Sequence, residues 1–485
     1  MAANYDPSMV TAVIPEIGLV VLIFVDLALD LLWMRKPDHL RKLGWLTAGG
    51  LVVIIGLSFA FATPGTEPVL LFGGMLRQDW LAFIFRLVVL TGAAVTSLFA
   101  MDSEGLGNRG EFYLLLLSST LGMSLMAASA DLIMLYLAIE TTSIPLYVLS
   151  GFLIRDNKSS EAGFKYFLFG AMTSAVMLYG FSLLYGFSGT TQIYRLAEML
   201  QAGEVAPLAM MGVGLLVLVG FGFKIAAVPL HFWAPDVYEG APTVVTGFLS
   251  TASKAAGFAV LMRVVVAVFP AITPLWTIVL STMSVASMIL GNTLALAQKN
   301  IKRLLAYSSI AHAGYVLIGV ATLTPLGVTG AVYYLIAYLV TNLAAFGVVT
   351  VTSRSVGSDE ISAYAGLSRR SPGMALALLV ALLSLGGIPP FAGFFAKVLV
   401  FGAAVQANLV WLAVVGVVNA IVGLYYYLSV LKVVYLYRSE DETKPLTITP
   451  AWKLALWVCV AGILVIGVLI APGFSWATAA AASLF

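Results

Sequence analysis

The stretch GFGFKIAAVPLHFWAPDVYEGAPTVVTGFLSTASKAAGFAVL, residues 220–261, decides the fold of this chain. Two long apolar segments meet in it, and each carries a lysine, Lys224 or Lys254, near its middle. Pro229 interrupts the first segment, because proline lacks a backbone donor and its ring clashes with the carbonyl four residues earlier. An isolated charge at bilayer depth costs at least about 2.5–3.5 kcal/mol, so such lysines usually face protein or water and have a function there.

The rest of the chain has the composition of a membrane protein. Of its 485 residues, 61% are hydrophobic and only 10% are charged, whereas a soluble globular protein carries about 25% charged residues. Apolar runs repeatedly exceed the ~20 residues that cross a hydrocarbon core, and the short alternating segments typical of a β-barrel are absent from the sequence. We therefore expect an all-α polytopic membrane protein.

Hydropathy and turn signals predict about 14 transmembrane helices in a single membrane domain, 1–485. The loops between the helices are short, so no extramembrane domain is expected. The predicted spans are 11–33, 43–63, 80–100, 111–129, 131–154, 161–187, 209–233, 241–267, 273–297, 302–322, 326–352, 373–404, 408–436 and 451–472.

Basic loop residues predict the orientation, because cytoplasmic loops carry an excess of Lys and Arg. The opposite loops offer little beyond Arg77 and Arg195. This asymmetry predicts an even number of spans in a bacterial inner membrane, with both termini on the outer side. Alternate loops, starting after the first span, contain Arg35, Lys36, Arg41, Lys42, Arg109, Arg155, Lys158, Lys299, Lys302, Arg303, Arg354, Arg369, Arg370, Arg438 and Lys444.

Several function classes are excluded by the composition. The net charge of +2 implies no nucleic-acid partner, and the three histidines are too scattered for a metal site. The single cysteine, Cys459, forms no internal disulfide and is expected to pack in an apolar span. The N-terminus lacks the basic region of a cleaved signal peptide, so the first span is expected to be retained. No nucleotide fingerprint, haem motif or iron–sulfur cysteine set is present, so any redox cofactor belongs to another subunit.

A single proline interrupts one long apolar span, and a pair of prolines interrupts another at a related position. Pro229 lies in the seventh span, and Pro389 and Pro390 lie in the twelfth. Broken helices at corresponding points of two halves are typical of inverted-repeat transporters with sites at mid-membrane. We predict a three-helix N-terminal segment at 1–109, two inverted five-helix repeats at 110–267 and 268–437, and a last helix in 438–485.

Four ionisable residues lie deep in the predicted spans: Glu140, Lys224, Lys254 and Lys397. Burial disfavours the charged form of lysine, whereas a neighbouring carboxylate favours it. A Lys224–Glu140 pair would therefore hold a proton when closed and release it when opened, which arginine does not do. The alternative for each residue is structural: a hydrogen-bonded glutamate, a snorkelling Lys224, or lysines paired to another helix.

Three further residues are secondary candidates for a proton path. Lys165 lies one turn inside the sixth span, where we expect it to snorkel to the cytoplasmic face. His231 follows Pro229 closely, and His312 lies mid-span in the hydroxyl-rich stretch YSSIAHAGY. For each histidine, a relay and a hydrogen-bonded structural role stay open. Tyrosines at 425–427 are expected to be packing residues with polar tips.

Three motifs resemble those of a known family. They are VPLHFWAPDVYEGAPTVVTGFLSTASKAAGF (228–258), QKNIKRLLAYSSIAHAGY (298–315) and LSLGGIPPFAGFFAKVLVF (383–401). They are similar to the antiporter-like membrane subunits of the proton-pumping NADH:quinone oxidoreductase, respiratory complex I. The resemblance covers about residues 110 to 437. The PDVYEGAPT form, the lysine at 397 and the 14 spans resemble the subunit N branch most, the counterpart of mitochondrial subunit 2.

This resemblance implies two inverted five-helix repeats with discontinuous seventh and twelfth helices. Glu140 matches the family's fifth-helix glutamate and Lys224 the seventh-helix lysine paired with it. Lys254 matches the central eighth-helix lysine, and Lys397 the twelfth-helix lysine near the outer exit. FMN, iron–sulfur clusters and quinone are implied in partner subunits. The implied partners are the lipid bilayer and other complex I membrane subunits, including antiporter-like paralogues, in a hetero-oligomer.

The sequence thus predicts a proton-translocating membrane-arm subunit of NADH:quinone oxidoreductase, with no redox site of its own. Protons would enter from the cytoplasmic side in the first half, charge Lys224 and Lys254, and leave through Lys397. Two other functions stay open. A subunit of a multi-subunit cation/proton antiporter would share the charged skeleton, although the PDVYEGAPT form argues against it. A structural membrane subunit that moves no ions is the other, and the buried lysines argue against it.

Overall fold

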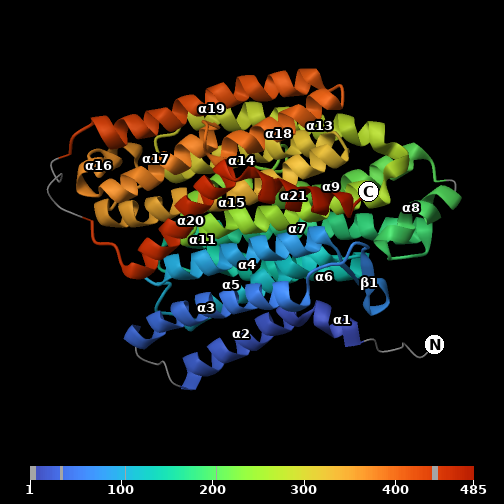
Figure 1. Cartoon of the computed structure of the whole chain (residues 1–485), viewed down its shortest axis with the longest axis horizontal. Coiled ribbons are helices and arrows are strands. Elements are labelled where there is room, and N and C mark those ends of the chain that lie inside the picture. Colours follow the sequence, from blue (N-terminus) through green and yellow to red (C-terminus); the bar gives the residue numbers. More distant parts are fainter. Residues whose placement is uncertain (1–6, 33–36, 104, 204, 440–445) are drawn as a thin grey trace.

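The computed structural model describes residues 7–32, 37–103, 105–203, 205–439 and 446–485, which form an elongated bundle of helices (Figure 1). In chain order the elements are α1 (Pro7–Ala12), α2 (Ile14–Leu32), α3 (Pro37–Phe61), β1 (Val69–Leu71), η1 (Phe72–Gly74), β2 (Leu76–Gln78), α4 (Trp80–Ala100), α5 (Gly110–Ala128), α6 (Leu132–Ser150), α7 (Asn157–Ser188), α8 (Ile193–Ala202), α9 (Pro207–Ile225), α10 (Trp233–Gly240), α11 (Thr243–Phe248), the π turn η2 (Leu249–Ser253), α12 (Lys254–Val268), η3 (Pro270–Ile272), α13 (Thr273–Leu296), α14 (Ile301–Ala321), α15 (Pro325–Val356), η4 (Ile361–Tyr364), α16 (Leu367–Arg370), α17 (Pro372–Gly386), α18 (Ala392–Gln406), α19 (Val410–Leu436), α20 (Pro450–Val468) and α21 (Ile470–Ala482).

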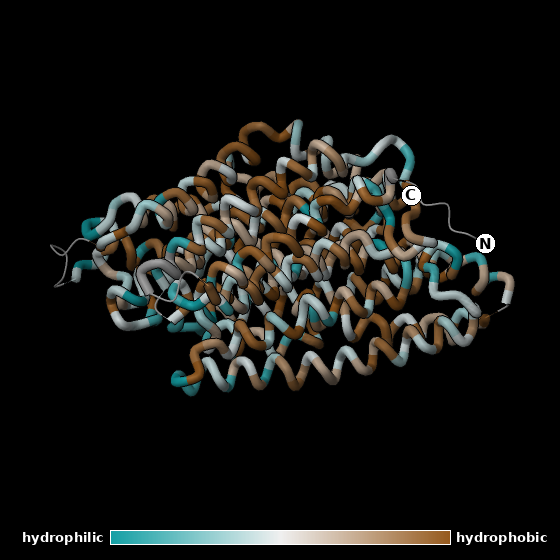
Figure 2. The backbone as a smooth tube through the Cα atoms, turned by 90° about the horizontal axis from the view of Figure 1, so that it is seen from below, coloured by the Kyte–Doolittle hydropathy of each residue, from teal (hydrophilic) through white to brown (hydrophobic). Residues whose placement is uncertain are grey.

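The bundle is a polytopic membrane fold, as the sequence predicted. Among the described residues, 12 helices are long and apolar enough to cross a bilayer. The shorter apolar helices α17 and α18 follow one another in the chain, and α2 is 19 residues long but carries Glu16, Asp26 and Asp30. Hydrophilic segments gather toward the two ends of the bundle, with apolar residues between them (Figure 2). The total of 14 spans stays a prediction.

Four helices form the centre of the bundle and are buried along most of their length: α4, α12, α14 and α15. Helices α1 to α3 lie on one flank, and α19 lies on the opposite flank (Figure 1). Close approach of α13 to α14 depends on glycine, since a Cβ at Gly314 would come 2.8 Å from the Ser284 carbonyl oxygen. Small residues at helix interfaces serve this purpose in membranes. The result is a tightly packed wall beside the site described below.

Both predicted helix breaks are present, although the first lies earlier than expected. Helix α9 ends at Ile225, where Ala226 takes the left-handed conformation with φ 53°, and the chain resumes as α10 at Trp233. The predicted span 209–233 is therefore wrong at its C-terminal end, because that turn comes before Pro229. The second break follows α17, where Gly387 has φ 84°. The inverted-repeat relation between 110–267 and 268–437 stays a prediction.

The sequence analysis missed several short elements. Among them are the β1–β2 hairpin, the short helix α8, the π turn before Lys254, and α21, which follows α20 and packs against α15 and α4. Hydropathy finds long apolar runs, whereas these segments are short or differ from their neighbours only in backbone hydrogen bonding. The last predicted span, 451–472, thus runs into a second helix.

Basic side chains mark one face of the bundle, which we call the basic face. Lys158, Lys302 and Arg354 line one cavity on it, and Arg303 lies beside Lys158. On a separate part of the molecule, Arg77 packs its guanidinium over the Tyr194 ring. Arg35, Lys36 and Lys444 lie outside the described residues. Which face meets the cytoplasm stays a prediction.

Candidate functional site

Lys224 occupies the last turn of α9, beside the first helix break. Its side chain is buried, and its Nζ has no hydrogen-bond partner among the described residues. The C-terminal end of a helix carries partial negative charge, which favours a cation there. Gly257 of α12 packs against it, since a Cβ at that position would lie 3.2 Å from Lys224 Cβ. Helix α12 thus brings Lys254 to the same region of the core.

Glu140 lies on α6 and is half-buried. Ser174 of α7 donates a short hydrogen bond to one of its carboxylate oxygens. The Glu140 charge acts electrostatically on Lys224, but the two groups form no ion pair in this structure. The Lys224–Glu140 pair is therefore not closed in this structure, and its role in holding and releasing a proton stays a prediction. Ser174 occupies one carboxylate oxygen, and the amine of Lys224 lies farther inside the bundle.

Lys254 begins α12 directly after the π turn η2. Its side chain is 3% exposed, and its Nζ donates to the carbonyl oxygen of Ser309 at 2.9 Å and to the Ser309 hydroxyl at 2.6 Å. The hydroxyls of Tyr238 and Tyr338 lie near Ser309 and form no hydrogen bond with any described residue. Buried polar groups normally find partners. Unpartnered buried hydroxyls beside the Lys254 amine are the kind of polar groups that buried water molecules bond.

His312 lies on α14, between the lysines of the two halves. Its Nδ1 is 2.7 Å from the hydroxyl of Tyr334, and its Nε2 is 3.2 Å from the hydroxyl of Tyr427. Tyr427 also shares a short hydrogen bond with Ser308. The charges of both Lys254 and Lys397 act on His312. An imidazole with a hydroxyl at each nitrogen is able to pass a proton between them.

Lys397 lies on α18, one turn after the second helix break. Its Nζ donates to the carbonyl oxygens of Leu385 and Gly386, at 2.8 and 3.0 Å. These carbonyls end α17 and lack the partners that a continuous helix would supply. The ammonium also lies 5.0 Å from the centroid of the Tyr315 ring, within reach of a cation–π contact. Pro389 and Pro390 thus create the acceptors that hold this lysine.

The structure brings three of the predicted residues, Lys254, His312 and Lys397, into one polar line through the core. From Lys254 the line passes through Ser309 to the region of Tyr338, whose ring lies 5.1 Å from the His312 ring. From His312 it continues past Tyr315 to Lys397, since the Tyr315 ring lies 5.6 Å from the imidazole ring and 5.0 Å from the Lys397 ammonium. His231 is outside this line, because it lies in the connection between α9 and α10, half-buried and with Nδ1 unpartnered among the described residues.

Sequence reasoning missed several hydroxyl groups of the site. Tyr426 and Tyr427 were expected only to pack, yet both make buried hydrogen bonds. Tyr425, by contrast, is 68% exposed. Three adjacent tyrosines on a helix point in different directions, and only the packing of α19 against α13 and α14 decides which are internal.

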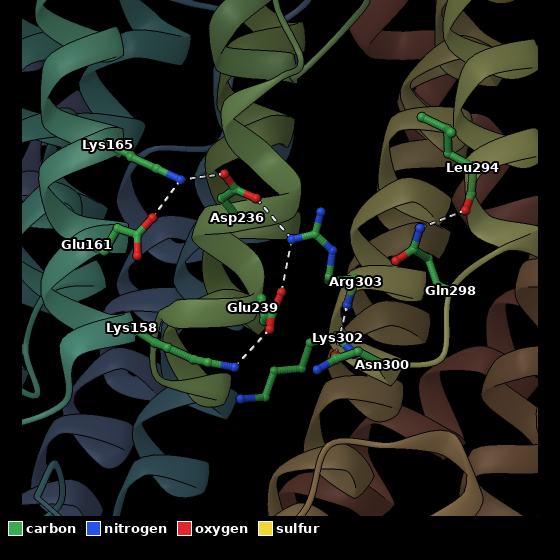
Figure 3. A network of polar contacts seen from close by, with 10 residues as sticks. All are labelled: Lys158, Glu161, Lys165, Asp236, Glu239, Leu294, Gln298, Asn300, Lys302 and Arg303. Atoms are coloured by element: carbon green, nitrogen blue, oxygen red, sulfur yellow. Dashed lines mark hydrogen bonds and ion pairs between the residues drawn. The ribbon is translucent and has the colours of Figure 1, made fainter.

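Lys165 lies in a separate ion network on the basic face, which we call the α10 clamp (Figure 3). Its ion pairs join α7, α10 and α14, with N–O distances of 2.6 to 3.0 Å. Burial raises the pKa of the two α10 carboxyls, but hydrogen bonds from lysine and arginine outweigh it and hold each pKa below its ordinary value. The clamp consists of Lys158, Glu161, Lys165, Asp236, Glu239 and Arg303.

The described residues hold no cluster of three or more His, Cys, Asp or Glu side chains with the geometry of a metal site. Broken helices that carry buried lysines in a multi-span bundle define the class: an antiporter-like membrane protein. Residues 129–423 match the family described as NADH:quinone oxidoreductase/Mrp antiporter, transmembrane. The chain belongs to this family, within its antiporter-like membrane subunits of NADH:quinone oxidoreductase.

Relatives of known name agree with this assignment. NADH-quinone oxidoreductase subunit N of Moorella thermoacetica is 42% identical over 447 residues, which cover 92% of this chain and 93% of the relative. NAD(P)H-quinone oxidoreductase subunit 2 of Synechococcus elongatus is 41% identical over 485 residues, covering 96% and 91%. A chain of respiratory complex I from Thermus thermophilus superposes with a TM-score of 0.80 and 34% identity, covering 95% of this chain and 99% of that chain.

Proposed function

We propose that this chain translocates protons as a membrane-arm subunit of an NADH:quinone oxidoreductase. The supporting observation is the polar line from Lys254 through Ser309 and His312 toward Lys397, inside a bundle whose other core residues are mostly apolar. Lysine suits this task because its amine binds and releases a proton, and burial makes release easier. Glu140 and Lys224 supply the start of the line.

In this proposal the basic face is the cytoplasmic face of a bacterial inner membrane, with both termini outside. Protons enter through the first half, load Lys224 and Lys254, and pass through His312 to Lys397, from which they leave. Repulsion between neighbouring ammonium groups favours stepwise movement. FMN, iron–sulfur clusters and quinone belong to partner subunits, which supply the energy. Separation of Lys224 from Glu140 in this structure fits the opened state of the pair.

The test replaces Lys254 in the assembled complex. Lys254→Ala removes the central proton carrier, so the rate of proton transfer through this chain should fall by about 100-fold or more. Lys254→Arg keeps the charge but does not release its proton, and it should be equally defective. The measurement is protons pumped per quinone reduced in inverted membrane vesicles. Lys453→Ala, at an exposed position of α20, serves as the matched control.

The outcome separates the three candidate functions. Intact assembly with unchanged pumping in Lys254→Ala would favour a structural subunit that moves no ions. Sodium-dependent proton exchange by the purified complex without quinone reduction would favour the multi-subunit cation/proton antiporter. The matched family includes both oxidoreductase and antiporter members, so the exchange assay belongs in the same experiment.

A further inference from the structure

We infer that the chain has a second proton inlet, which leads from the basic face directly to Lys397 and is closed by a hydrogen bond between Tyr426 and Asn292. This inference rests on the proposed function and adds an entrance to it. In the path proposed above, Lys397 receives protons only by way of Lys254 and His312. The inlet would load it from the same side of the membrane without using the first half.

The inlet begins at a cavity of about 270 Å³ between the end of α13, the start of α14, η4 and α19. Polar side chains stand at its mouth, namely Gln298, Lys299 and Glu360. Lys299 at its mouth lies three residues before Lys302 of the basic face, so the cavity opens near that face. Its inner end reaches Tyr426, about 15 Å along α19 from the end of that helix at 1.5 Å per residue.

A single layer of hydrogen-bonded groups separates this cavity from Lys397. The Tyr426 hydroxyl donates to Asn292 Oδ1 at 3.1 Å, and Asn292 Nδ2 donates to the Tyr315 hydroxyl at 3.1 Å. The ring of Tyr315 lies under the Lys397 ammonium. The cavity and the lysine are therefore on opposite sides of one amide and two phenols.

Burying polar side chains at membrane depth costs free energy, so the polar groups of this layer are expected to have a structural or functional role. One alternative is that they only hold α13, α14 and α19 together, because amide side chains bond helices in membranes. Gly423 lets α19 approach this layer closely. A Cβ at this position would lie 3.2 Å from Asn292 Oδ1 and 3.6 Å from the Tyr426 hydroxyl. Such close approach serves helix packing, but helix packing does not explain the cavity that leads to Tyr426.

The chemistry of the layer fits a gate. A neutral amide neither gains nor loses a proton near neutral pH, so Asn292 blocks transfer while Tyr426 is bonded to it. When the Tyr426 side chain turns away from Asn292, water from the cavity reaches Tyr315 and Lys397. A hydronium ion then gives its proton to the lone pair of the Lys397 amine, which leaves water and an ammonium group.

Thiol labelling tests whether the gate opens to the basic face. Cys459, the single cysteine of the chain, is buried in α20 and is replaced by alanine. Ser308→Cys then places a probe thiol at the gate, where Ser308 is buried beside Tyr426 and Tyr427. Ser284→Cys, on α13 and equally buried, provides the control thiol. A charged, membrane-impermeant thiol reagent is added to one side of vesicles that contain the assembled complex.

Two variants change access through the gate in opposite directions. Tyr426→Phe removes the closing hydrogen bond, which should raise the labelling rate at 308 by about fivefold, because one hydrogen bond contributes only modestly to the net free energy. Ser429→Trp fills the cavity that Ser429 lines and should abolish labelling at 308. Neither variant should change labelling at 284, and label added on the side opposite the basic face should not react. Equal rates at 308 with and without Tyr426→Phe would overturn the inlet.

Pumping measurements separate this inference from the proposed function. If Lys254→Ala leaves pumping unchanged, the proposed path fails, whatever labelling rates are measured at 308 and 284. If Lys254→Ala lowers pumping and Tyr426→Phe leaves labelling at 308 unchanged, only the inlet fails. Should Tyr426→Phe not assemble, Asn292→Leu, which removes the amide and its hydrogen bonds, takes its place. Labelling at 308 must then rise, because no acceptor holds Tyr426 closed, and an unchanged rate counts against the gate.

Discussion

At the scale of single residues, Lys397 illustrates how a backbone break becomes a binding site for a charge. A continuous helix would use the carbonyls of Leu385 and Gly386 internally, whereas the break after α17 leaves them free to accept from the ammonium. Gly387 makes this geometry available, because its φ of 84° lies in the left-handed region. Its missing side chain also leaves room for the lysine stem, since a Cβ would come 2.9 Å from Lys397 Cδ.

Gly387→Ala is therefore expected to displace Lys397 and to destabilise the second break. The left-handed conformation costs an alanine about 1–2 kcal/mol, and the clash with the lysine stem adds to it. The measurement is the thermal unfolding midpoint of the purified complex together with its proton yield. Gly402→Ala, in α18 with open space at its Cβ, is the matched control and should be neutral or slightly stabilising. Equal effects of both substitutions would contradict this account.

At the scale of elements, the α10 clamp fixes the short helix that follows the first break. Helix α10 is only eight residues long, and isolated helices of that length are marginal in water. Ion pairs with α7 and α14 hold it at the basic face (Figure 3). Its position decides where the apolar wall of the first half ends. The clamp is partly exposed, so each pair contributes modestly, about 1 kcal/mol or less.

The clamp should weaken in acid but not at mildly acidic pH. The folded-state pKa values of Asp236 and Glu239 lie below their ordinary values. Their contribution to stability is thus complete above the unfolded-state pKa, near 4, and is lost as pH falls through the lower folded-state values. Hydrogen exchange in α10, corrected for intrinsic rates, should be constant from neutral pH to about 5 and should rise only below about 4.

A substitution gives the same test at constant pH. Asp236→Asn removes the charge that Lys165 and Arg303 share, so exchange in α10 should be up to about fivefold faster. Asp359→Asn breaks a neighbouring ion pair with Lys302 that does not involve α10, and it should leave that helix unchanged. Faster exchange in both variants would mean that general surface charge, rather than the clamp, stabilises α10.

At the scale of the whole molecule, a buried ion pair joins segments that are distant in the chain. Arg263 at the end of α12 donates to both carboxylate oxygens of Asp79, the N-cap residue of α4, at 2.7 and 2.9 Å. It also donates to the Ala127 carbonyl oxygen and to the Tyr194 hydroxyl. Helix α12 is thus tied to the start of α4 by an arginine that is 1% exposed.

Asp79→Ala should prevent stable assembly of the complex. It would leave a buried guanidinium without its counter-charge, which costs about 3–5 kcal/mol. Asp79→Leu combined with Arg263→Met removes both charges and should restore much of the assembly, because apolar replacements of buried pairs are often neutral. The measurement is the amount of this chain that co-purifies with its partner subunits. A double variant as defective as Asp79→Ala would contradict a purely electrostatic cause.

The sequence by itself determined the fold class, the approximate spans, both breaks and the four mid-membrane charges. The physical reason is that lipid penalises every exposed charge and unpaired backbone group, so exceptions such as Lys254 or Pro229 are visible without a structure. Serines and tyrosines carry little such penalty in a hydropathy pattern. Whether Tyr426 meets Asn292, or Ser309 meets Lys254, depends on contacts between helices distant in sequence. Only the tertiary structure decided these partners, because helix packing, not composition, sets which side chains face each other.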